Sequence, residues 1–503
     1  MSLYGIFARL TLITFLGAAL AACGGSSDSS TDVADDSGTG TPVTDGGGND
    51  DGSGEGAGNE GGDPPPVESK LLFSADDIVH GVELWKTDGT EAGTVLVKDI
   101  NPAGGDSDPS GFIRYGQYAY FVADTDEHGS ELWRTDGTEA GTTLVRDIQP
   151  GNSGSNPSGF VEFDGLLYFR ADDGTTGAEL WRTDGTEQGT ELVRDIDEGT
   201  SGSGVGYLAV LGDFLYFRAD DDISGRELWR TDGTEAGTVL FKDIRAGAEG
   251  SLNNPQITTE LFLYNDVLYF AADDDVSGLE LWRTDGTEAG TILLKDINLG
   301  DLPSAPNDFV LFDGELYFRA RTTEDGQRLW KTDGTSNGTV TVGEGFSFPF
   351  TFQVFNNELY FQASSPGNAV EPWKTDGTAG GTRLLKDINP GLESSNDAGS
   401  FFGFTEFMGE LYFNARIPDT GQELWKTDGT EAGTGLFKDI NPGFFPSGMR
   451  ERIVFGDGLF FRASDGVAGL ELWRSDGTVE NTVLLKDINA SGSSSPDDFF
   501  IFE

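Results

Sequence analysis

ELWKTDGT, from Glu83 to Thr90, is the first of nine related phrases in this chain, and every tryptophan of the protein lies in one of them. These nine residues are Trp85, Trp133, Trp181, Trp229, Trp282, Trp330, Trp373, Trp425 and Trp473. Successive tryptophans are separated by 43 to 53 residues, a period typical of propellers and solenoids. We therefore expect an array of one repeated unit in which the tryptophans are structural.

One unit, taken from residues 158–196, has the pattern of a four-stranded antiparallel blade. Asp-Gly pairs at 164–165 and 184–185 indicate hairpin turns. The longest connection, such as residues 149–158, joins the fourth strand to the next unit, as a propeller requires. The four expected strands are Phe160–Phe163, Leu167–Ala171, Glu179–Thr183 and Thr190–Ile196.

The two ends of the array complement each other. The first unit begins near Lys70 with a second strand, LLFSA, whereas the chain ends on a first strand, DDFFIFE. Pairing of these pieces would complete one blade and remove the open sheet edges. We predict an all-β fold, a β-propeller of nine four-stranded blades closed by the N- and C-terminal strands. An open superhelical arc and two smaller rings are the alternatives.

Counting residues across the Trp85 hairpin predicts its register. A six-residue loop, 88–93, places Thr87 opposite Thr94, Trp85 opposite Leu96, and Glu83 opposite Lys98. The counting predicts an ion pair beside each tryptophan that stitches the blade. In the sixth unit both partners are replaced together, by Arg328 and Gly343.

The repeated phrase and its trailing GTVLVKDINP resemble the bacterial ELWxxDGT repeat, and nine copies cover residues 70 to about 490. The resemblance implies a secreted or surface protein and no particular reaction. Departures from the repeat, such as Arg328 and Pro372, fall in the sixth and seventh units.

The N-terminal segment has the pattern of an export signal. Residues 1–22 contain one early cation and a short apolar run, as expected of a signal peptide. Leu20 to Cys23 resemble a bacterial lipobox, so Cys23, the single cysteine, is the expected lipidation site. Residues 23–69 are expected to be a disordered acidic tether rich in Gly, Ser and Asp, followed by the propeller at 70–503. We expect an outer-membrane or cell-surface lipoprotein.

The net charge of -54 limits the partners. Nucleic acid and anionic lipid surfaces bind through clustered cations, so we expect neither, and membrane contact only through the lipid anchor. A monomer that binds protein or polysaccharide is expected.

Few residues are suited to catalysis. The two histidines, His80 and His128, are expected to be variable loop residues, with a metal pair as the alternative. Acidic loops between second and third strands suggest bound calcium, with solvated turns as the alternative. The candidate ligands are Asp172, Asp173, Asp220, Asp221, Asp222, Asp273, Asp274 and Asp275.

The later repeats are enriched in phenylalanine. Alternation from Phe346 to Val354 predicts a half-buried strand, and SFFGF spans residues 400–404. Phe444 and Phe445, in a connection between blades, are candidate ligand-binding residues, with ordinary packing as the alternative.

The sequence therefore predicts a surface-tethered, non-enzymatic binding or scaffold lipoprotein. Its alternatives are a carbohydrate-active enzyme that uses carboxylates in the propeller channel and a purely structural envelope protein.

Overall fold

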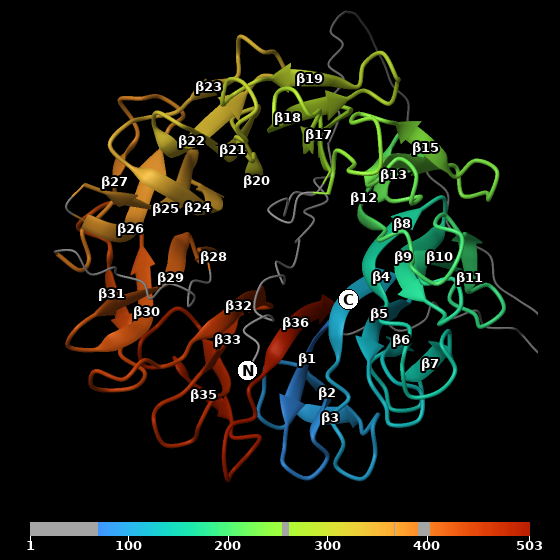
Figure 1. The fold of residues 1–503 in the computed structure, drawn as a ribbon. Helices are drawn as coiled ribbons and strands as arrows, with labels where there is room; N and C mark the ends of the chain where they lie inside the picture. Colours follow the sequence, from blue (N-terminus) through green and yellow to red (C-terminus); the bar gives the residue numbers. More distant parts are fainter. Residues whose placement is uncertain (1–68, 254–260, 367, 391–402) are drawn as a thin grey trace, which may run out of the picture. The chain divides into compact units, whose positions relative to one another are not determined.

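The computed structural model describes residues 69–253, 261–366, 368–390 and 403–503, which form nine antiparallel sheets of four strands each. The sheets follow one another around a ring (Figure 1). Every regular element in these ranges is a strand, and none of the residues described forms a helix that could cross a membrane. The predicted nine-bladed β-propeller is confirmed.

Each blade has an innermost and a second strand. The innermost strands of blades 1 to 9 are β36 (Asp497–Phe502), β4 (Ser110–Tyr115), β8 (Ser158–Phe163), β12 (Gly206–Leu211), β16 (Phe262–Tyr264), β20 (Asn307–Phe312), β24 (Ser347–Phe355), β28 (Thr405–Phe407) and β32 (Arg450–Phe455). The second strands are β1 (Lys70–Asp76), β5 (Tyr118–Ala123), β9 (Leu166–Asp172), β13 (Phe214–Ala219), β17 (Val267–Asp273), β21 (Glu315–Thr322), β25 (Glu358–Ser365), β29 (Glu410–Ile417) and β33 (Gly458–Ala463).

The repeated phrase begins in the third strand. The third strands are β2 (Val82–Thr87), β6 (Glu131–Thr135), β10 (Ala178–Thr183), β14 (Glu227–Thr231), β18 (Leu279–Thr284), β22 (Gly326–Thr332), β26 (Asn368–Thr375), β30 (Gly421–Thr427) and β34 (Glu471–Ser475). The outer strands are β3 (Val95–Lys98), β7 (Thr143–Arg146), β11 (Glu191–Arg194), β15 (Val239–Lys242), β19 (Ile292–Lys295), β23 (Val340–Thr341), β27 (Arg383–Leu384), β31 (Gly435–Lys438) and β35 (Val483–Lys486).

The two ends of the array close the ring. Strand β36 pairs antiparallel with β1, with Lys70 opposite Phe502 and Leu71 opposite Ile501. The Phe502 ring is buried in a core shared with Leu84 of blade 1 and Phe121 of blade 2. Blade 1 is therefore built from both ends of the propeller, as predicted, and the open arc and the two smaller rings are ruled out.

The core lies between neighbouring blades. On β9, Tyr168 packs with Phe217 and Trp229 of blade 4, whereas Phe169 packs with Tyr120 of blade 2. The second strand is therefore buried on both faces, which explains its continuous apolar run. Each tryptophan is buried and packs against the preceding blade, as Trp229 does against blade 3.

The TDGT turn is held by its own side chains. Thr87 faces Thr94 as predicted, with the two hydroxyl oxygens 2.8 Å apart. Thr87 Oγ1 also accepts the Gly89 N–H at 3.0 Å, and Asp88 Oδ1 accepts the Thr90 N–H at 2.8 Å. These local bonds make the turn independent of any ligand.

The glycine of this turn is required by the neighbouring blade. Gly185 has a φ of +89°, and a Cβ there would lie 2.1 Å from the hydroxyl oxygen of Tyr120 in blade 2. Arg134 of blade 2 donates to the Gly185 carbonyl oxygen at 2.7 Å. The phrase from glutamate to threonine is thus a structural unit, and the residues that could confer function lie elsewhere.

The antiparallel order of each blade gives the ring two different faces. Hairpins between second and third strands lie on the same face as the long connections between blades, and we call this the loop face. The opposite turn face carries the short turns. Contacts agree with this assignment, since the connection residue Ser107 donates its N–H to Val82, beside a hairpin, at 2.8 Å.

Candidate functional site

The glutamate that begins each phrase holds a connection of the loop face in place. Glu83 is fully buried and accepts the N–H of Ile100 at 2.8 Å, that of Asn101 at 3.2 Å, and the Ser107 hydroxyl at 2.6 Å. We call this arrangement the latch. Buried glutamates occupy the position in eight blades: Glu83, Glu131, Glu179, Glu227, Glu280, Glu371, Glu423 and Glu471. Seven described serines are equivalent to Ser107 or share its role: Ser107, Ser155, Ser203, Ser251, Ser304, Ser447 and Ser494.

The predicted ion pair between Glu83 and Lys98 is wrong. Trp85 lies opposite Leu96 as predicted, but the register shifts between Leu84 and Trp85, so that Lys98 faces Leu84. The bulge turns the carboxylate toward the connection, where backbone N–H groups compensate for its burial.

The cations that were expected to pair with these glutamates cross to the next blade instead. Lys486 donates to the Thr94 carbonyl oxygen at 2.7 Å across the ring closure, and Lys295 donates to that of Thr339 at 2.8 Å. They therefore stitch neighbouring blades rather than strands within a blade.

Burial raises the pKa of the latch carboxyls in blades 1 to 5, 8 and 9, although several hydrogen bonds oppose it. The pKa of Glu83, Glu179 and Glu280 rises to about 7, and that of Glu423 to about 8. The serine suits both protonation states, since Ser107 Oγ lies 3.2 Å from the Val82 carbonyl oxygen. A protonated Glu83 can donate to that hydroxyl, which then donates to Val82.

The sixth blade departs from the repeat for two separate reasons. Arg328 replaces the latch glutamate and donates to the Phe346 carbonyl oxygen. Gly343 has a φ of +71°, and a Cβ there would lie 2.5 Å from Cγ2 of Thr382 in the next blade. The joint loss of Glu and Lys is therefore not the loss of an ion pair.

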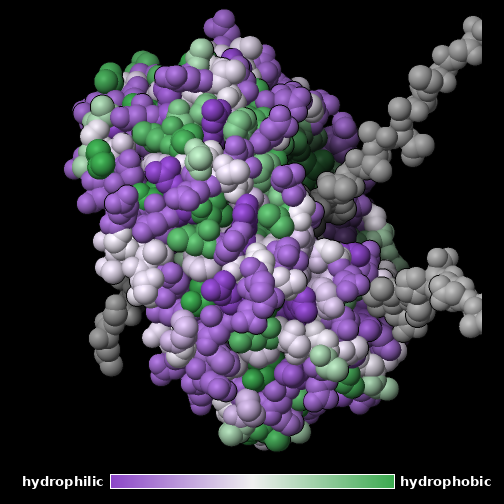
Figure 2. Space-filling view, turned by 90° about the vertical axis from the view of Figure 1, so that its right-hand side faces the viewer, coloured by the Kyte–Doolittle hydropathy of each residue, from purple (hydrophilic) through white to green (hydrophobic). Residues whose placement is uncertain are grey.

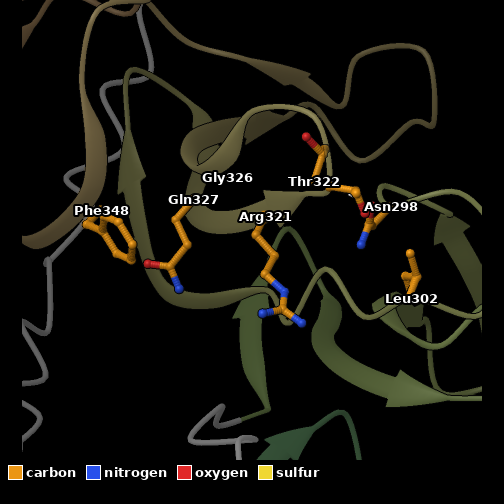
Figure 3. Close-up of a pocket in the computed structure, with 8 residues that line it drawn as sticks. Asn298, Leu302, Arg321, Thr322, Gly326, Gln327 and Phe348 are labelled. Atoms are coloured by element: carbon orange, nitrogen blue, oxygen red, sulfur yellow. Dashed lines mark hydrogen bonds between the residues drawn. The ribbon is translucent and has the colours of Figure 1, made fainter. Parts of the chain in front are cut away.

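The irregular sixth blade borders a hollow of about 350 Å³ on the loop face. Its walls come from the connection after blade 5, the β21–β22 hairpin and the start of β24. Phe348 and Leu302 lie at its two ends with Arg321 and Gln327 between them (Figure 3). The hollow thus combines apolar surfaces with polar groups that point into one space.

The polar groups of the hollow are only partly used. Arg321 donates through Nε to the Pro303 carbonyl oxygen at 3.1 Å, and within the residues described it forms no ion pair. Gln327 Oε1 is buried without a hydrogen-bond partner in the same part of the chain. Thr323 N–H donates to Asn298 Oδ1 at 2.8 Å, which ties the hairpin to the connection. The hollow therefore has a fixed wall and an arginine that has no carboxylate partner among the residues described.

Sequence reasoning missed Phe348, because it treated 346–354 as one regularly alternating strand. β24 instead has two register shifts, and Phe348 and Thr351 have positive φ values of 54° and 56°. Phe346 is buried, whereas Phe348 is 55% exposed. The irregularity places this aromatic ring at the hollow.

Most other exposed apolar side chains in hairpins and connections also lie on the loop face. Phe444 and Phe445 are 66% and 62% exposed, and their ring centroids are 4.2 Å apart. Both rings are therefore available at the surface, and ligand contact stays a prediction. The others are Ile78, Val79, Ile223, Val276, Leu299, Leu302 and Val467. The side view in Figure 2 shows a largely hydrophilic surface with separate apolar patches.

The predicted calcium ligands serve their own turns. Asp173 Oδ1 accepts the N–H groups of Thr175 and Thr176, each at 2.8 Å. Asp221 and Asp274 cap the equivalent hairpins in the same way, and Asp172, Asp220 and Asp273 each accept one N–H. Asp275 instead pairs with Arg245 at 2.8 Å, and the Asp222 N–H donates to Asp220. These contacts are those of turn caps, and calcium binding by these residues stays a prediction.

The histidines form separate contacts. His80 Nδ1 lies 2.7 Å from Asp77 Oδ2, and His128 Nδ1 lies 2.9 Å from Asp147 Oδ2. Across the described ranges, no group of three or more His, Cys, Asp or Glu side chains is arranged to hold a metal ion.

Two innermost strands bring two carboxyls together at the loop-face end of blades 9 and 1. Glu451 on β32 shares a side-chain hydrogen bond with Asp497 on β36, and burial followed by this contact raises the Glu451 pKa. Arg462 Nη1 lies 3.3 Å from Asp497 Oδ2. Sequence reasoning expected channel carboxylates in an enzyme but could not select these residues.

Cys23, the signal peptide at 1–22 and nearly all of the tether at 23–69 lie outside the described residues, as do Phe401 and Phe402. Phe404, from the same phenylalanine-rich run, is buried between blades 7 and 8.

No protein-family model and no curated protein matched the chain. Among solved structures, it is similar to puromycin hydrolase at 14% identity, with a TM-score of 0.38 over 70% of this chain and 58% of that one. It is also similar to a prolyl endopeptidase at 13% identity, with a TM-score of 0.39 over 70% of this chain and 54% of that one. Oligopeptidase B from Leishmania major is 12% identical, with a TM-score of 0.38 over 71% of this chain and 53% of that one. The chain spans between half and three fifths of those proteins, and likeness at this level transfers no activity.

Proposed function

We propose that the propeller is a non-enzymatic binding module that recognises a polysaccharide at the loop face through the hollow of blade 6. This proposal is supported by the different roles of the repeated and the variable residues. The repeated residues form latches, turns and core, whereas the residues that differ between blades are presented by rigidly held loops. Variable loops on a rigid scaffold are the usual location of binding residues.

The lining of the hollow favours a saccharide. The half-exposed Phe348 ring offers an apolar platform to the C–H face of a sugar, and the Arg321 guanidinium offers hydrogen-bond donors to its hydroxyls. The hollow is open and shallow beside an extended loop face, which suits one segment of a longer chain.

Affinity electrophoresis of the full chain in gels that contain envelope polysaccharides tests the proposal. Phe348→Ala should weaken retardation about fivefold or more, because an aromatic anchor contributes more than about 1 kcal/mol. Ile292→Ala removes an exposed apolar side chain from β19 and should bind normally. Equal retardation of the two variants, or binding of protein partners alone, would contradict the proposal.

A carbohydrate-active enzyme is the competing function, and the Glu451–Asp497 contact is the feature that favours it. The same polysaccharides distinguish the two functions, because an enzyme releases reducing ends with time and a binding module does not. Release that Glu451→Gln abolishes would establish the enzyme.

We also propose that Cys23 anchors the protein at the outer membrane or cell surface. The lipobox resemblance of Leu20 to Cys23 and the surface character of proteins with ELWxxDGT repeats support this. Cells fed a labelled fatty acid should label the protein, and Cys23→Ser should abolish labelling and release the protein from membranes.

A further inference from the structure

Three arginines lie near one another at the loop-face ends of blades 3 and 4. Arg170 lies opposite Ser158, and Arg218 lies opposite Gly206, so the two occupy equivalent positions on adjacent second strands. The charges of Arg226 and Arg170 both act on Arg218, whose pKa is lowered chiefly by burial. In a protein with a net charge of -54, such a gathering of cations requires an explanation.

The glycines of the adjoining connection make room for two of the guanidinium groups. A Cβ at Gly206 would lie 3.4 Å from Arg218 Nη2, and one at Gly204 would lie 3.4 Å from Arg226 Nε. Arg226 Nη1 donates to Asn253 Oδ1 at 3.0 Å, and the Arg218 guanidinium lies 4.4 Å from the Tyr207 ring centre. These neutral contacts orient the arginines without neutralising them.

The other blades provide an internal comparison. In blade 6 the equivalent Arg319 pairs with Asp308 at 3.1 Å, and in blade 9 Arg462 pairs with Asp497 at 3.3 Å. The bulge position filled by Asp308 holds Gly159 in blade 3 and Tyr207 in blade 4, each with positive φ. Arg170, Arg218 and Arg226 form no ion pair with any carboxylate in the part of the chain that the structure describes. The Nε atoms of Arg218 and Arg226 are also buried without acceptors there.

We propose that Arg170, Arg218 and Arg226 bind an oxyanion, a carboxylate or sulfate group carried by a ligand that enters from the loop face. Guanidinium groups match the planar, bidentate geometry of such anions. The site is distinct from the hollow of blade 6, and it stands whether or not that hollow binds a polysaccharide.

Calorimetric titration of the full chain with sodium sulfate and with sodium galacturonate, at matched chloride ionic strength, tests this site. Saturable binding of either anion is expected. Tyr207→Asp should weaken it by about tenfold or more, because an internal carboxylate then occupies the arginines and competes with the ligand. The aspartate is expected to fold there, since Asp308 has the same positive φ of 57° in blade 6.

Arg218→Gln is the second variant and should weaken binding similarly even if Tyr207→Asp does not fold. Arg114→Gln, at an exposed position on β4 outside both proposed sites, serves as the matched control and should bind both anions as the parent protein does. Binding of galacturonate alone assigns a carboxylate-bearing ligand, and binding of sulfate alone a sulfated one. Absence of saturable binding, or equal affinity in the parent protein and in Arg218→Gln, would overturn the proposal.

Discussion

Ser155 donates both its backbone N–H and its hydroxyl to the buried carboxylate of Glu131, 24 residues earlier in the chain, at 2.9 and 2.5 Å. Both residues are almost wholly excluded from solvent. The contact joins the start of a third strand to the connection that leads to the next blade, so it holds the loop face in one shape.

Ser155→Ala should lower the free energy of unfolding by about 1.5–3 kcal/mol, because a hydrogen bond to a buried charged group is lost without replacement. Ser153→Ala, an exposed serine in the same connection, should change it by less than about 0.5 kcal/mol. Chemical denaturation of both variants measures the difference, and equal stabilities would show that the latch does not stabilise the connection.

The raised pKa values of the latch glutamates predict that stability falls as the pH rises. Glu280 and Glu423 have folded pKa values of about 7 and about 8, above the unfolded value of 4.5, so their favourable contribution is complete below pH 4.5 and is lost as the pH rises through these folded values. The melting temperature should decrease between pH 5 and 8. In Glu280→Gln/Glu423→Gln this slope should be shallower than in the parent protein, and an unchanged slope would assign it to general charge repulsion.

Phe502→Ala should destabilise the propeller by about 3–5 kcal/mol, because it empties a buried site in the blade that closes the ring. Phe348→Ala removes a phenylalanine that is largely exposed and should leave the melting temperature nearly unchanged. If the two variants melt alike, the pairing of β36 with β1 does not close the ring in solution.

Restoring the repeat residue in blade 6 should be harmful. Gly343→Lys requires a positive φ for lysine and places Cβ against Thr382, so we expect a loss of about 1–3 kcal/mol. Gly435→Lys is the control, because that glycine on β31 has open space at its Cβ position. A gain in stability from Gly343→Lys would mean that the sixth blade retains the geometry of the others.

Part of the blade could be predicted by counting residues. Thr87 opposite Thr94 and Trp85 opposite Leu96 follow from the length of the hairpin loop, which is a local property. The predicted pairing of Glu83 with Lys98, further along the same two strands, is wrong because a bulge beside Leu84 shifts the register. The same bulge recurs in most blades, so a comparison of one repeat with another does not reveal it.

The hollow and the arginine cluster were beyond prediction for a different reason. Phe348 is turned outward by two register shifts, and Arg170 differs from Arg319 only in what a neighbouring strand places beside it. Such environments are set by residues on other strands and connections, so no pattern along one strand contains them.

The sequence by itself determined the number of blades, their strand order and the closure of the ring, because nine copies of one local pattern and two complementary ends admit few other arrangements. Only the tertiary structure decided which carboxylates are buried as latches and which cations lack an acid. Burial and ion pairing depend on the approach of neighbouring blades and connections, and a bulge of one residue is enough to redirect a side chain from one partner to another.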